Sequence, residues 1–281
     1  MGIDELKSWV GRSQQTTDVL SQGLVARFCA TFDRNEVDLP LGTPAPLAVH
    51  WALGALLTPT SELGPDGHPK KGGFLPPVPL PRRMWAAGDL NFHDRLRVGD
   101  EVRIRSEVAS IDFKEGRSGA LCFVRVDHQV DTSRGRAITE QQTIVYREAS
   151  TSNFVPSPTQ WDPPEDVILH REMKADTVLL FRYSALTFNS HRIHYDRDYA
   201  VDVERYPGLV VQAPLQATLL MNAVDDWLDG RKLKSFSFRA ERPMYDGDNL
   251  HQFGRLLSAH EVALWTCGAE GVPAVSAKVE F

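Results

Sequence analysis

The chain has 281 residues, of which 42% are hydrophobic and 24% are charged, and this balance excludes a disordered chain, a collagen-like chain and a long coiled coil. Its formal net charge of −6 offers no overall basic field to nucleic acid or to an anionic membrane. The widely spaced Cys29, Cys122 and Cys267 form neither a disulfide framework nor a zinc pattern, which indicates buried thiols in a reducing compartment. The N-terminus lacks the apolar core of a signal peptide, and no apolar stretch reaches the roughly 20 residues of a membrane helix. We therefore expect a cytoplasmic protein.

The first half of the chain reads as helices followed by strands. Apolar residues recur every three or four positions over 18–33, which predicts an amphipathic helix capped by Thr17 or Asp18, and a proline-opened apolar segment over 45–57 predicts a second helix. A loop rich in proline and glycine occupies 58–83, and a loop this long in a compact protein is usually functional or disordered. Period-two alternation then predicts half-buried strands at 98–108, 120–130 and 138–147.

The second half repeats this order. A polar, proline-rich stretch predicts a linker over 150–176. A segment rich in histidine and aspartate precedes a mostly apolar helix predicted over 213–228. The strands predicted after it are 234–240, 249–257, 261–268 and 274–281.

Two local matches suggest an internal duplication. Ala-Pro-Leu opens the second predicted helix of the first half at 45–47 and the long helix of the second half at 213–215, and Gly-Asp precedes a strand at 99–100 and at 247–248. The shared order of these landmarks predicts two copies of one unit, each a long helix wrapped by an antiparallel sheet. We expect an N-terminal half over 1–149, the linker over 150–176 and a C-terminal half over 177–281.

The densest cluster of chemically active residues comprises Asn189, His191, His194 and Asp196. Histidine titrates near neutral pH, so a histidine here can move a proton in either direction. The spacing of the two histidines with Asp196 would also suit a metal, but the sequence shows no third zinc-type ligand at a telling distance, and aspartate here is more typical of a helix cap. We expect no metal and no cofactor.

This cluster resembles a known family. Asn189-x-x-x-x-His194-x-Asp196, the helix entry over 208–215 and the strand motif Arg239, Pro243, Gly247, Asp248 resemble the MaoC-like, type 2 hydroxyacyl-thioester dehydratases. The resemblance implies an α+β double hot-dog fold with two long central helices and with both sheets joined into one. The first half contains no counterpart to this cluster, so we expect one active site per duplicated unit, with the first half supplying surface for an acyl-CoA substrate. Within the family, the chain is most similar to itaconyl-CoA and mesaconyl-CoA hydratases, which implies a hydro-lyase acting on a short branched C5 dicarboxylic enoyl-CoA.

Carried over residue by residue, the family pattern places the catalytic histidine on His194 and departs from this sequence at three positions. The family's catalytic aspartate falls on Asn189, which cannot act as a base, its adjacent asparagine falls on His191, and its oxyanion-hole glycine falls on Ala213. We therefore expect His194 to act as base on water and then as acid at the α carbon, with Asn189 orienting the water or the substrate. The main-chain N–H of Ala213 would polarise the thioester carbonyl.

Five further residues are candidates for contact with the substrate. Arg82 and Arg83 end the long loop, where they either solvate the loop exit or bind a carboxylate or a CoA phosphate. Ser190, His191 and Gln212 flank the expected catalytic positions. A hot-dog thioesterase and a non-catalytic acyl-CoA-binding module are alternative functions, and both a monomer and a homodimer of the duplicated unit are compatible with the sequence.

Overall fold

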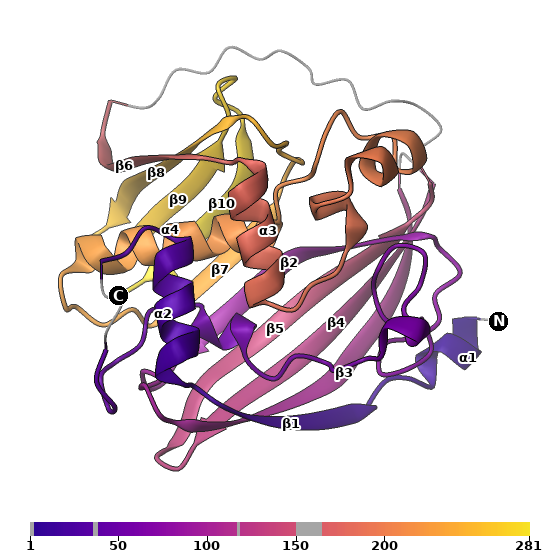
Figure 1. Cartoon of the computed structure of the whole chain (residues 1–281), viewed down its shortest axis with the longest axis horizontal. Coiled ribbons are helices and arrows are strands. Elements are labelled where there is room, and N and C mark those ends of the chain that lie inside the picture. The colour runs from indigo at the N-terminus through magenta and orange to yellow at the C-terminus, as the bar shows by residue number, and fades with distance from the viewer. Residues whose placement is uncertain (1–2, 36–38, 117–118, 150–164) are drawn as a thin grey trace.

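A single antiparallel sheet forms the frame of the computed structural model, which describes residues 3–35, 39–116, 119–149 and 165–281 (Figure 1). Ten strands within these ranges follow the order β1-β3-β4-β5-β2-β7-β10-β9-β8-β6. The strands are β1 (Ser13–Val19), β2 (Arg82–Phe92), β3 (Glu101–Gly116), β4 (Gly119–Thr132), β5 (Gly135–Arg147), β6 (Val167–Lys174), β7 (Ser235–Ala240), β8 (Asn249–Ser258), β9 (Glu261–Cys267) and β10 (Pro273–Glu280). The helices are α1 (Ile3–Lys7), α2 (Gln22–Thr31), α3 (Thr177–Leu186) and α4 (Ala213–Leu228), with short helical turns η1 (Val49–Ala52), η2 (Thr60–Glu62), η3 (Arg192–His194) and η4 (Tyr199–Val203).

The two halves of the sheet mirror each other about the pair β2 and β7. Read from either edge inward, the order β1-β3-β4-β5-β2 matches β6-β8-β9-β10-β7, and β2 pairs with β7 from Ala87 opposite Arg239 to Asn91 opposite Ser235. Gly99 and Gly247, the glycines of the repeated Gly-Asp, both adopt a left-handed φ of 93° two residues before the first residue of β3 and of β8. The α+β fold with the two sheets joined into one is confirmed, as are the strands predicted from alternation.

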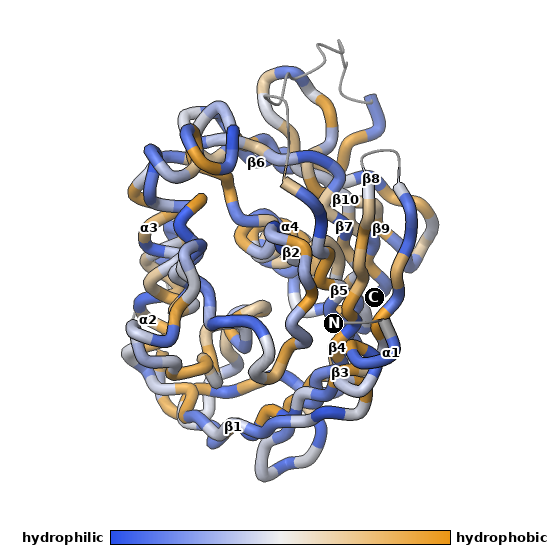
Figure 2. The backbone as a smooth tube through the Cα atoms, turned by 90° about the vertical axis from the view of Figure 1, so that its right-hand side faces the viewer, coloured by the Kyte–Doolittle hydropathy of each residue, from blue (hydrophilic) through white to orange (hydrophobic). Residues whose placement is uncertain are grey.

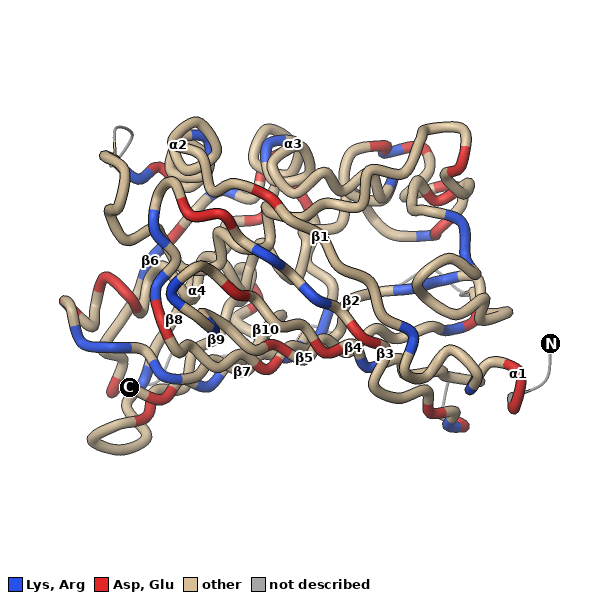
Figure 3. Tube along the Cα trace, turned by 90° about the horizontal axis from the view of Figure 1, so that it is seen from below, with Lys and Arg blue, Asp and Glu red and all other residues tan. Residues whose placement is uncertain are grey.

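The long helix α4 is buried between the sheet and a second helical layer. Pro214 lies in its first turn, where the missing N–H of proline costs no helical hydrogen bond, and eleven of its sixteen residues are buried. Figures 2 and 3 show α2 and α3 side by side on the side of α4 away from the sheet. None of the helices in the described ranges is long and apolar enough to cross a membrane.

The prediction of two long central helices is wrong for the first half. Residues 45–57 contain only the short turn η1, because Ala48 and Gly54 adopt left-handed φ values of 65° and 62° that interrupt a helix. The helix predicted over 18–33 is also shorter, since residues 13–19 pair with β3 as strand β1. Its N-cap is Ser21, whose hydroxyl accepts a hydrogen bond from the N–H of Leu24.

The linker predicted over 150–176 is partly a strand. Residues 150–164 lie outside the described ranges, but 167–174 form β6, which pairs with β8 at the edge of the sheet. The second unit therefore begins before 177, and the rest of the predicted division of the chain stays a prediction. The buried state of the cysteines is confirmed, and burial raises the pKa of the Cys122 and Cys267 thiols to about 11.

Candidate active site

One cavity of about 960 Å³ brings together residues from both halves of the chain. The first half contributes the loop that precedes β2, together with β2 and β5, and the second half contributes the segment between α3 and α4 and the end of β7. The residues that line the cavity include Trp51, Asp66, His68, Arg82, Arg83, Trp85, Asn189, His191, His194, Gln212 and Ala213. The cavity therefore lies between the duplicated units, where sequence motifs far apart in the chain can meet.

Asn189 is held in a local turn just after α3. Its main-chain N–H donates to the carbonyl oxygen of Ser184 at 2.8 Å, and its side-chain Oδ1 accepts from the main-chain N–H of His191 at 3.1 Å. Asparagine suits such a turn because its side chain can bond the backbone two residues further on. Since Oδ1 is used in this way, the amide nitrogen is the group that Asn189 can offer to a water or a substrate in the cavity.

His194 is a buried imidazole with an assigned proton. Its Nδ1 lies 2.7 Å from the carbonyl oxygen of Val210, and because a carbonyl oxygen only accepts, Nδ1 carries the hydrogen. Burial lowers the pKa of His194 to about 4, against the opposing effect of the Val210 hydrogen bond. The ring is therefore neutral at neutral pH, with Nε2 left as a hydrogen-bond acceptor, which is the state that a general base requires.

His191 packs next to this ring and is also neutral. The two ring centroids are 5.2 Å apart at an interplanar angle of 89°. Burial lowers the pKa of His191 well below its usual value, and the neighbouring His194 and Arg83 lower it further. His191 thus lines the cavity as an uncharged imidazole, in the position that the family pattern gives to asparagine.

The loop predicted over 58–83 docks directly on the motif-bearing segment. The main-chain N–H of Arg192 donates to the carbonyl oxygen of Asp66 at 2.9 Å, and the Ser190 hydroxyl donates to the carbonyl oxygen of Gly67 at 2.5 Å. A Cβ at Gly67 would lie 1.9 Å from the carbonyl oxygen of Ser190, so glycine alone permits this approach. This docking places two side chains of the first half, Asp66 and His68, in the cavity.

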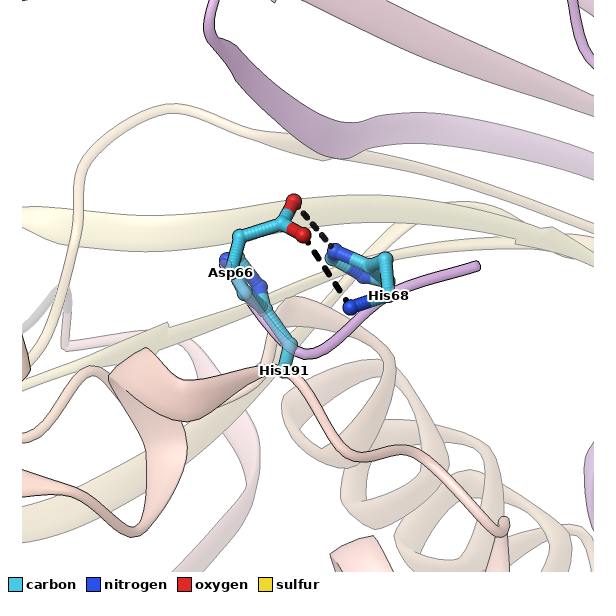
Figure 4. A group of neighbouring side chains, drawn as sticks. All are labelled: Asp66, His68 and His191. Atoms are coloured by element: carbon cyan, nitrogen blue, oxygen red, sulfur yellow. Dashed lines mark hydrogen bonds and ion pairs between the residues drawn. The ribbon is translucent and has the colours of Figure 1, made fainter. Parts of the chain in front are cut away.

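Asp66 and His68 form a hydrogen-bonded pair beside His191 (Figure 4). Oδ2 of Asp66 lies 3.0 Å from Nδ1 of His68, and its Oδ1 accepts from the main-chain N–H of His68 at 3.1 Å. Burial raises the pKa of Asp66, while the Arg83 guanidinium opposes the rise, with its Nε 3.7 Å from Oδ2. The rings of His68 and His191 have centroids 4.1 Å apart, so His191 contacts both His68 and His194.

The same three side chains are close enough together to ligate a cation. One ligand atom from each of Asp66, His68 and His191 lies within 4.8 Å of the others. Two features oppose a metal: the Asp66 carboxylate is already bonded to His68, and Arg83 and Lys71 place positive charge beside it. The contacts favour a proton over a metal ion between Asp66 and His68.

Two of the residues expected to contact the substrate, Arg82 and Ser190, are bonded to other parts of the chain instead. Arg82 lines the cavity, but its Nε is ion-paired with the Glu204 carboxylate at 2.6 Å, so its charge is already used. Ser190 is not among the lining residues, because its hydroxyl fastens Gly67. Both departures follow from contacts with segments remote in sequence.

Gln212, Ala213 and Arg83 do lie at the cavity. The amide nitrogen of Gln212 donates to the carbonyl oxygen of Leu180 and to the hydroxyl of Ser184, which fixes the entry of α4 against α3. Ala213 begins α4, so its N–H belongs to the turn that has no acceptor within the helix. Asp196 is a cap, as predicted, since its Oδ1 accepts from the N–H of Tyr199 at 3.1 Å.

Trp51 and Trp85 form another part of the enclosure, and Phe238 packs against both. Trp51 and Trp85 meet edge to face with centroids 5.0 Å apart, and Phe238 lies 6.0 Å from Trp51 and 5.8 Å from Trp85. The indole N–H of Trp51 donates to both carboxylate oxygens of the buried Glu140, at 3.0 and 3.2 Å. Trp51 comes from η1, the segment that is not a long helix, so the short turn lets an indole face the cavity.

Sequence reasoning missed Asp66, His68 and Trp51. The available signal was an acid and an imidazole around a glycine, Asp66-Gly67-His68, within a loop too long to be only a connection. The loop contacts a segment that lies more than a hundred residues away in the sequence, and no local sequence pattern contains such contacts.

Comparison with known proteins assigns the family. A family model described as hydroxyacyl-thioester dehydratase type 2 matches residues 48–246. The chain belongs to the hydroxyacyl-thioester dehydratase type 2 family. As a member, this dehydratase-family protein is a hydro-lyase, and the resemblance inferred from its motifs is confirmed.

Two relatives illustrate the range of this family. The chain is 41% identical over 284 residues to a mesaconyl-C(4)-CoA hydratase of Chloroflexus aurantiacus, with 100% of this chain and 99% of the relative covered. It is 25% identical over 243 residues to the mitochondrial hydroxyacyl-thioester dehydratase type 2 of Schizosaccharomyces pombe, covering 77% of this chain and 78% of the relative. These relatives support acyl-thioester hydratase chemistry for the dehydratase-family protein.

Solved structures agree on the fold of this family member. A MaoC-like dehydratase superposes with a TM-score of 0.73 at 15% identity, covering 98% of this chain and 99% of the other. A MaoC-like dehydratase of Phytophthora capsici gives 0.69 at 14% identity over 100% and 99% of the two chains. A Mycobacterium tuberculosis protein described as a double hot-dog gives 0.60 at 13% identity over 96% and 95%. The double hot-dog fold is thereby confirmed.

Proposed function

We propose that the protein hydrates, and in reverse dehydrates, the C=C bond of a short branched C5 dicarboxylic enoyl-CoA such as mesaconyl-CoA or itaconyl-CoA. The observation that carries the proposal is the neutral His194, whose Nδ1 is held by the Val210 carbonyl and whose Nε2 remains as an acceptor on a cavity-lining ring. The full-length similarity to a protein named mesaconyl-C(4)-CoA hydratase supports the acyl class.

The site residues divide the addition of water among them. When the C=C bond is conjugated with the thioester, as in mesaconyl-C(4)-CoA, the water oxygen bonds to the β carbon, one water proton moves to Nε2 of His194, and the π electrons of the C=C bond move towards the thioester as an enolate. Ala213 offers its N–H to the enolate oxygen at the positive end of the α4 dipole, and the amide nitrogen of Asn189 holds the water. Protonation of the α carbon completes the hydrated product.

The charge of the cavity supports an anionic substrate. Its lining carries five arginines and three carboxylates: Arg82, Arg83, Arg147, Arg205 and Arg242 against Asp66, Glu204 and Glu241. Arg83 is largely buried, with an exposed fraction of 8%, and its Nη2 donates to the carbonyl oxygen of Pro69. Its Nε lies 3.7 Å from Oδ2 of Asp66, too far for a hydrogen bond, so we assign the Arg83 guanidinium to the free carboxylate of the acyl group.

The function is tested by assaying the purified protein on mesaconyl-C(4)-CoA, itaconyl-CoA and crotonyl-CoA. We expect loss of enoyl absorbance without release of CoA thiol. Release of thiol would assign a thioesterase instead, and tight CoA binding without turnover would assign a binding module.

The acyl class is tested with Arg83→Lys, which keeps the charge but removes the planar fork. We expect KM for the dicarboxylic esters to rise about tenfold, or ~1.4 kcal/mol, with little change for crotonyl-CoA. Arg103→Lys, at an exposed position of β3, is the matched control. Equal effects on dicarboxylic and monocarboxylic esters would contradict the assignment of Arg83.

A further inference from the structure

We propose that Asp66 and His68 are the second acid–base pair of this site, with His68 donating the proton to the α carbon and Asp66 positioning His68. The inference rests on the proposed hydration. It gives the docked loop a chemical role. The two proton transfers, which we expected from the sequence to involve His194 alone, are then shared between His194 and His68.

The first argument is the location of a carboxylate. Asn189 stands where the family pattern has an acid, and an amide cannot hold a titrating proton. The carboxylate of Asp66 lines the same cavity, brought there from the first half by the bond between its carbonyl oxygen and the N–H of Arg192. The site therefore still contains a carboxylate, supplied by the other duplicated unit.

The second argument is the geometry of His68. A carboxylate accepts, so Nδ1 of His68 carries the hydrogen that is shared with Oδ2 of Asp66 at 3.0 Å. Nε2 is then the nitrogen that can exchange a proton with a ligand. The His68 side chain has an exposed fraction of 24%, so it can recover a proton from solvent.

The surroundings of His68 favour its charged form next to Asp66 and disfavour charge on His191. The charged and titratable groups around the pair are Asp66, Lys71, Arg83, Tyr146, His191, Arg192, His194 and Tyr199. Asp66 is the negative group bonded directly to His68, the Nε of Arg83 lies 3.7 Å from the same Oδ2, and the charge of Lys71 also acts on Asp66. Because an adjacent carboxylate favours imidazolium, His68 is the imidazole of the row suited to act as an acid.

The protons balance over one hydration. Water gives one proton to Nε2 of His194 as its oxygen bonds to the β carbon, and His68 imidazolium gives the Nε2 proton to the α carbon as the enolate electrons form the new C–H bond. The product has gained one water, His194 has gained a proton and His68 has lost one. Release of a proton by His194 and uptake of one by His68 restore the starting state.

The experiment compares the pH dependence of kcat/KM in the wild type and two variants. With one imidazole acting as base and the other as acid, the plot of kcat/KM against pH is bell-shaped. Activity falls at acidic pH because His194 must be neutral, and it falls at basic pH because His68 must be protonated. His68→Gln is expected to lower kcat by about 100-fold, leave KM within about threefold and abolish the basic limb alone. Asp66→Asn is expected to move the basic limb to lower pH, because it removes the negative charge that stabilises the His68 imidazolium, and Asp66→Glu should restore part of the shift.

Controls separate chemistry from folding. His93→Gln and Asp89→Asn make the same substitutions at exposed positions of the first half and should keep the wild-type bell. Circular dichroism and the melting temperature report whether His68→Gln and Asp66→Asn stay folded, and a folded His68→Gln that keeps both limbs and a kcat within about threefold overturns the proposal. Loss of wild-type activity with a chelator and its return with Zn²⁺ alone would assign the cluster to a cation and also overturn it. An inactive wild type on all three esters would reject the proposed function itself, which distinguishes the two failures.

Discussion

The main-chain N–H of Arg192 donates to the carbonyl oxygen of Asp66 at 2.9 Å, which joins the long loop of the first half to the histidine motif of the second. Arg192 also reaches the carbonyl oxygen of Pro65 with its guanidinium at 3.0 Å. The cavity is thus closed by a contact between the duplicated units, and residues on both sides of that contact should affect activity together.

Gly67→Ala is expected to disrupt this contact. The new Cβ would lie 1.9 Å from the carbonyl oxygen of Ser190, and the φ of 86° is itself strained for alanine. We expect a loss of stability of at least about 1–3 kcal/mol in urea denaturation and a large fall in kcat as the loop shifts. Gly42→Ala, at a φ of 85° with nothing within 4 Å of its Cβ, is the control for strain alone. Equal losses of stability and of kcat in the two variants would show that the site does not depend on the close approach of Gly67 to the carbonyl oxygen of Ser190.

His194→Ala is expected to abolish hydration. The variant loses the acceptor for the water proton, so kcat/KM should fall by at least about 1,000-fold while CoA binding persists. Steady-state kinetics and calorimetric titration with CoA measure the two quantities. Turnover within about tenfold of the wild type, a barrier change of only ~1.4 kcal/mol, would rule out His194 as the base.

The wild-type activity should stay high down to mildly acidic pH. Burial lowers the pKa of His194 to about 4, and the base works only when neutral, so kcat/KM is expected to fall only as the pH falls through about 4. A pH profile over the range in which circular dichroism shows a folded protein provides the measurement. An acidic limb centred near the usual histidine value would contradict a desolvated His194.

The same burial makes the fold sensitive to acid. The pKa of His194 is lower in the folded state than in the unfolded state, so the unfolded chain binds more protons below about pH 6.5. The stabilisation is complete above that pH and decreases as the pH falls towards about 4, by an amount on the order of 3 kcal/mol. Urea denaturation at pH 7.5 and pH 5 measures the free energy of unfolding at each pH. The difference between the two values should be smaller for His194→Gln than for the wild type, and equal differences would refute the linkage.

Asn189→Asp tests the departure from the family pattern. The carboxylate can still accept from the N–H of His191, but it no longer donates to water, and its negative charge favours protonation of the neighbouring histidines. We expect kcat to fall about tenfold and the acidic limb to move to higher pH. Unchanged or faster turnover would show that the amide nitrogen is not needed.

Trp51→Ala tests the aromatic wall. Removal of an indole that packs against Trp85 and Phe238 enlarges the cavity, so longer enoyl-CoA esters should gain in kcat/KM relative to the C5 esters. Trp51→Phe should give a smaller change, and Trp227→Ala, outside the cavity lining, should leave the chain-length preference as it is. A preference unaffected by Trp51→Ala would place the acyl group elsewhere.

Local patterns in the sequence were sufficient for the family and for seven of the ten described strands, but not for β1, β2 and β6. A half-buried strand requires alternating side chains whatever its neighbours are, and Gly99 and Gly247 mark matching turns because both need a left-handed φ. The motif that contains Asn189 and His194 identified two side chains that line the cavity, because its spacing is set within a few residues of one turn.

Tertiary contacts decided what those patterns do not contain. Residues 45–57 have the composition of a helix, yet Ala48 takes a left-handed conformation and Trp51 faces the cavity. Arg82 resembles a ligand of the substrate, yet Glu204 neutralises it. Length, composition and charge excluded whole classes of protein. The position of the long loop, in contrast, depends on the contacts that Asp66 and Gly67 make with the segment around the distant Arg192. Burial and pairing are properties of the folded neighbours, so the sequence determined the frame and the histidine motif, and the packing of the two units determined which side chains meet at the cavity and the charge around them.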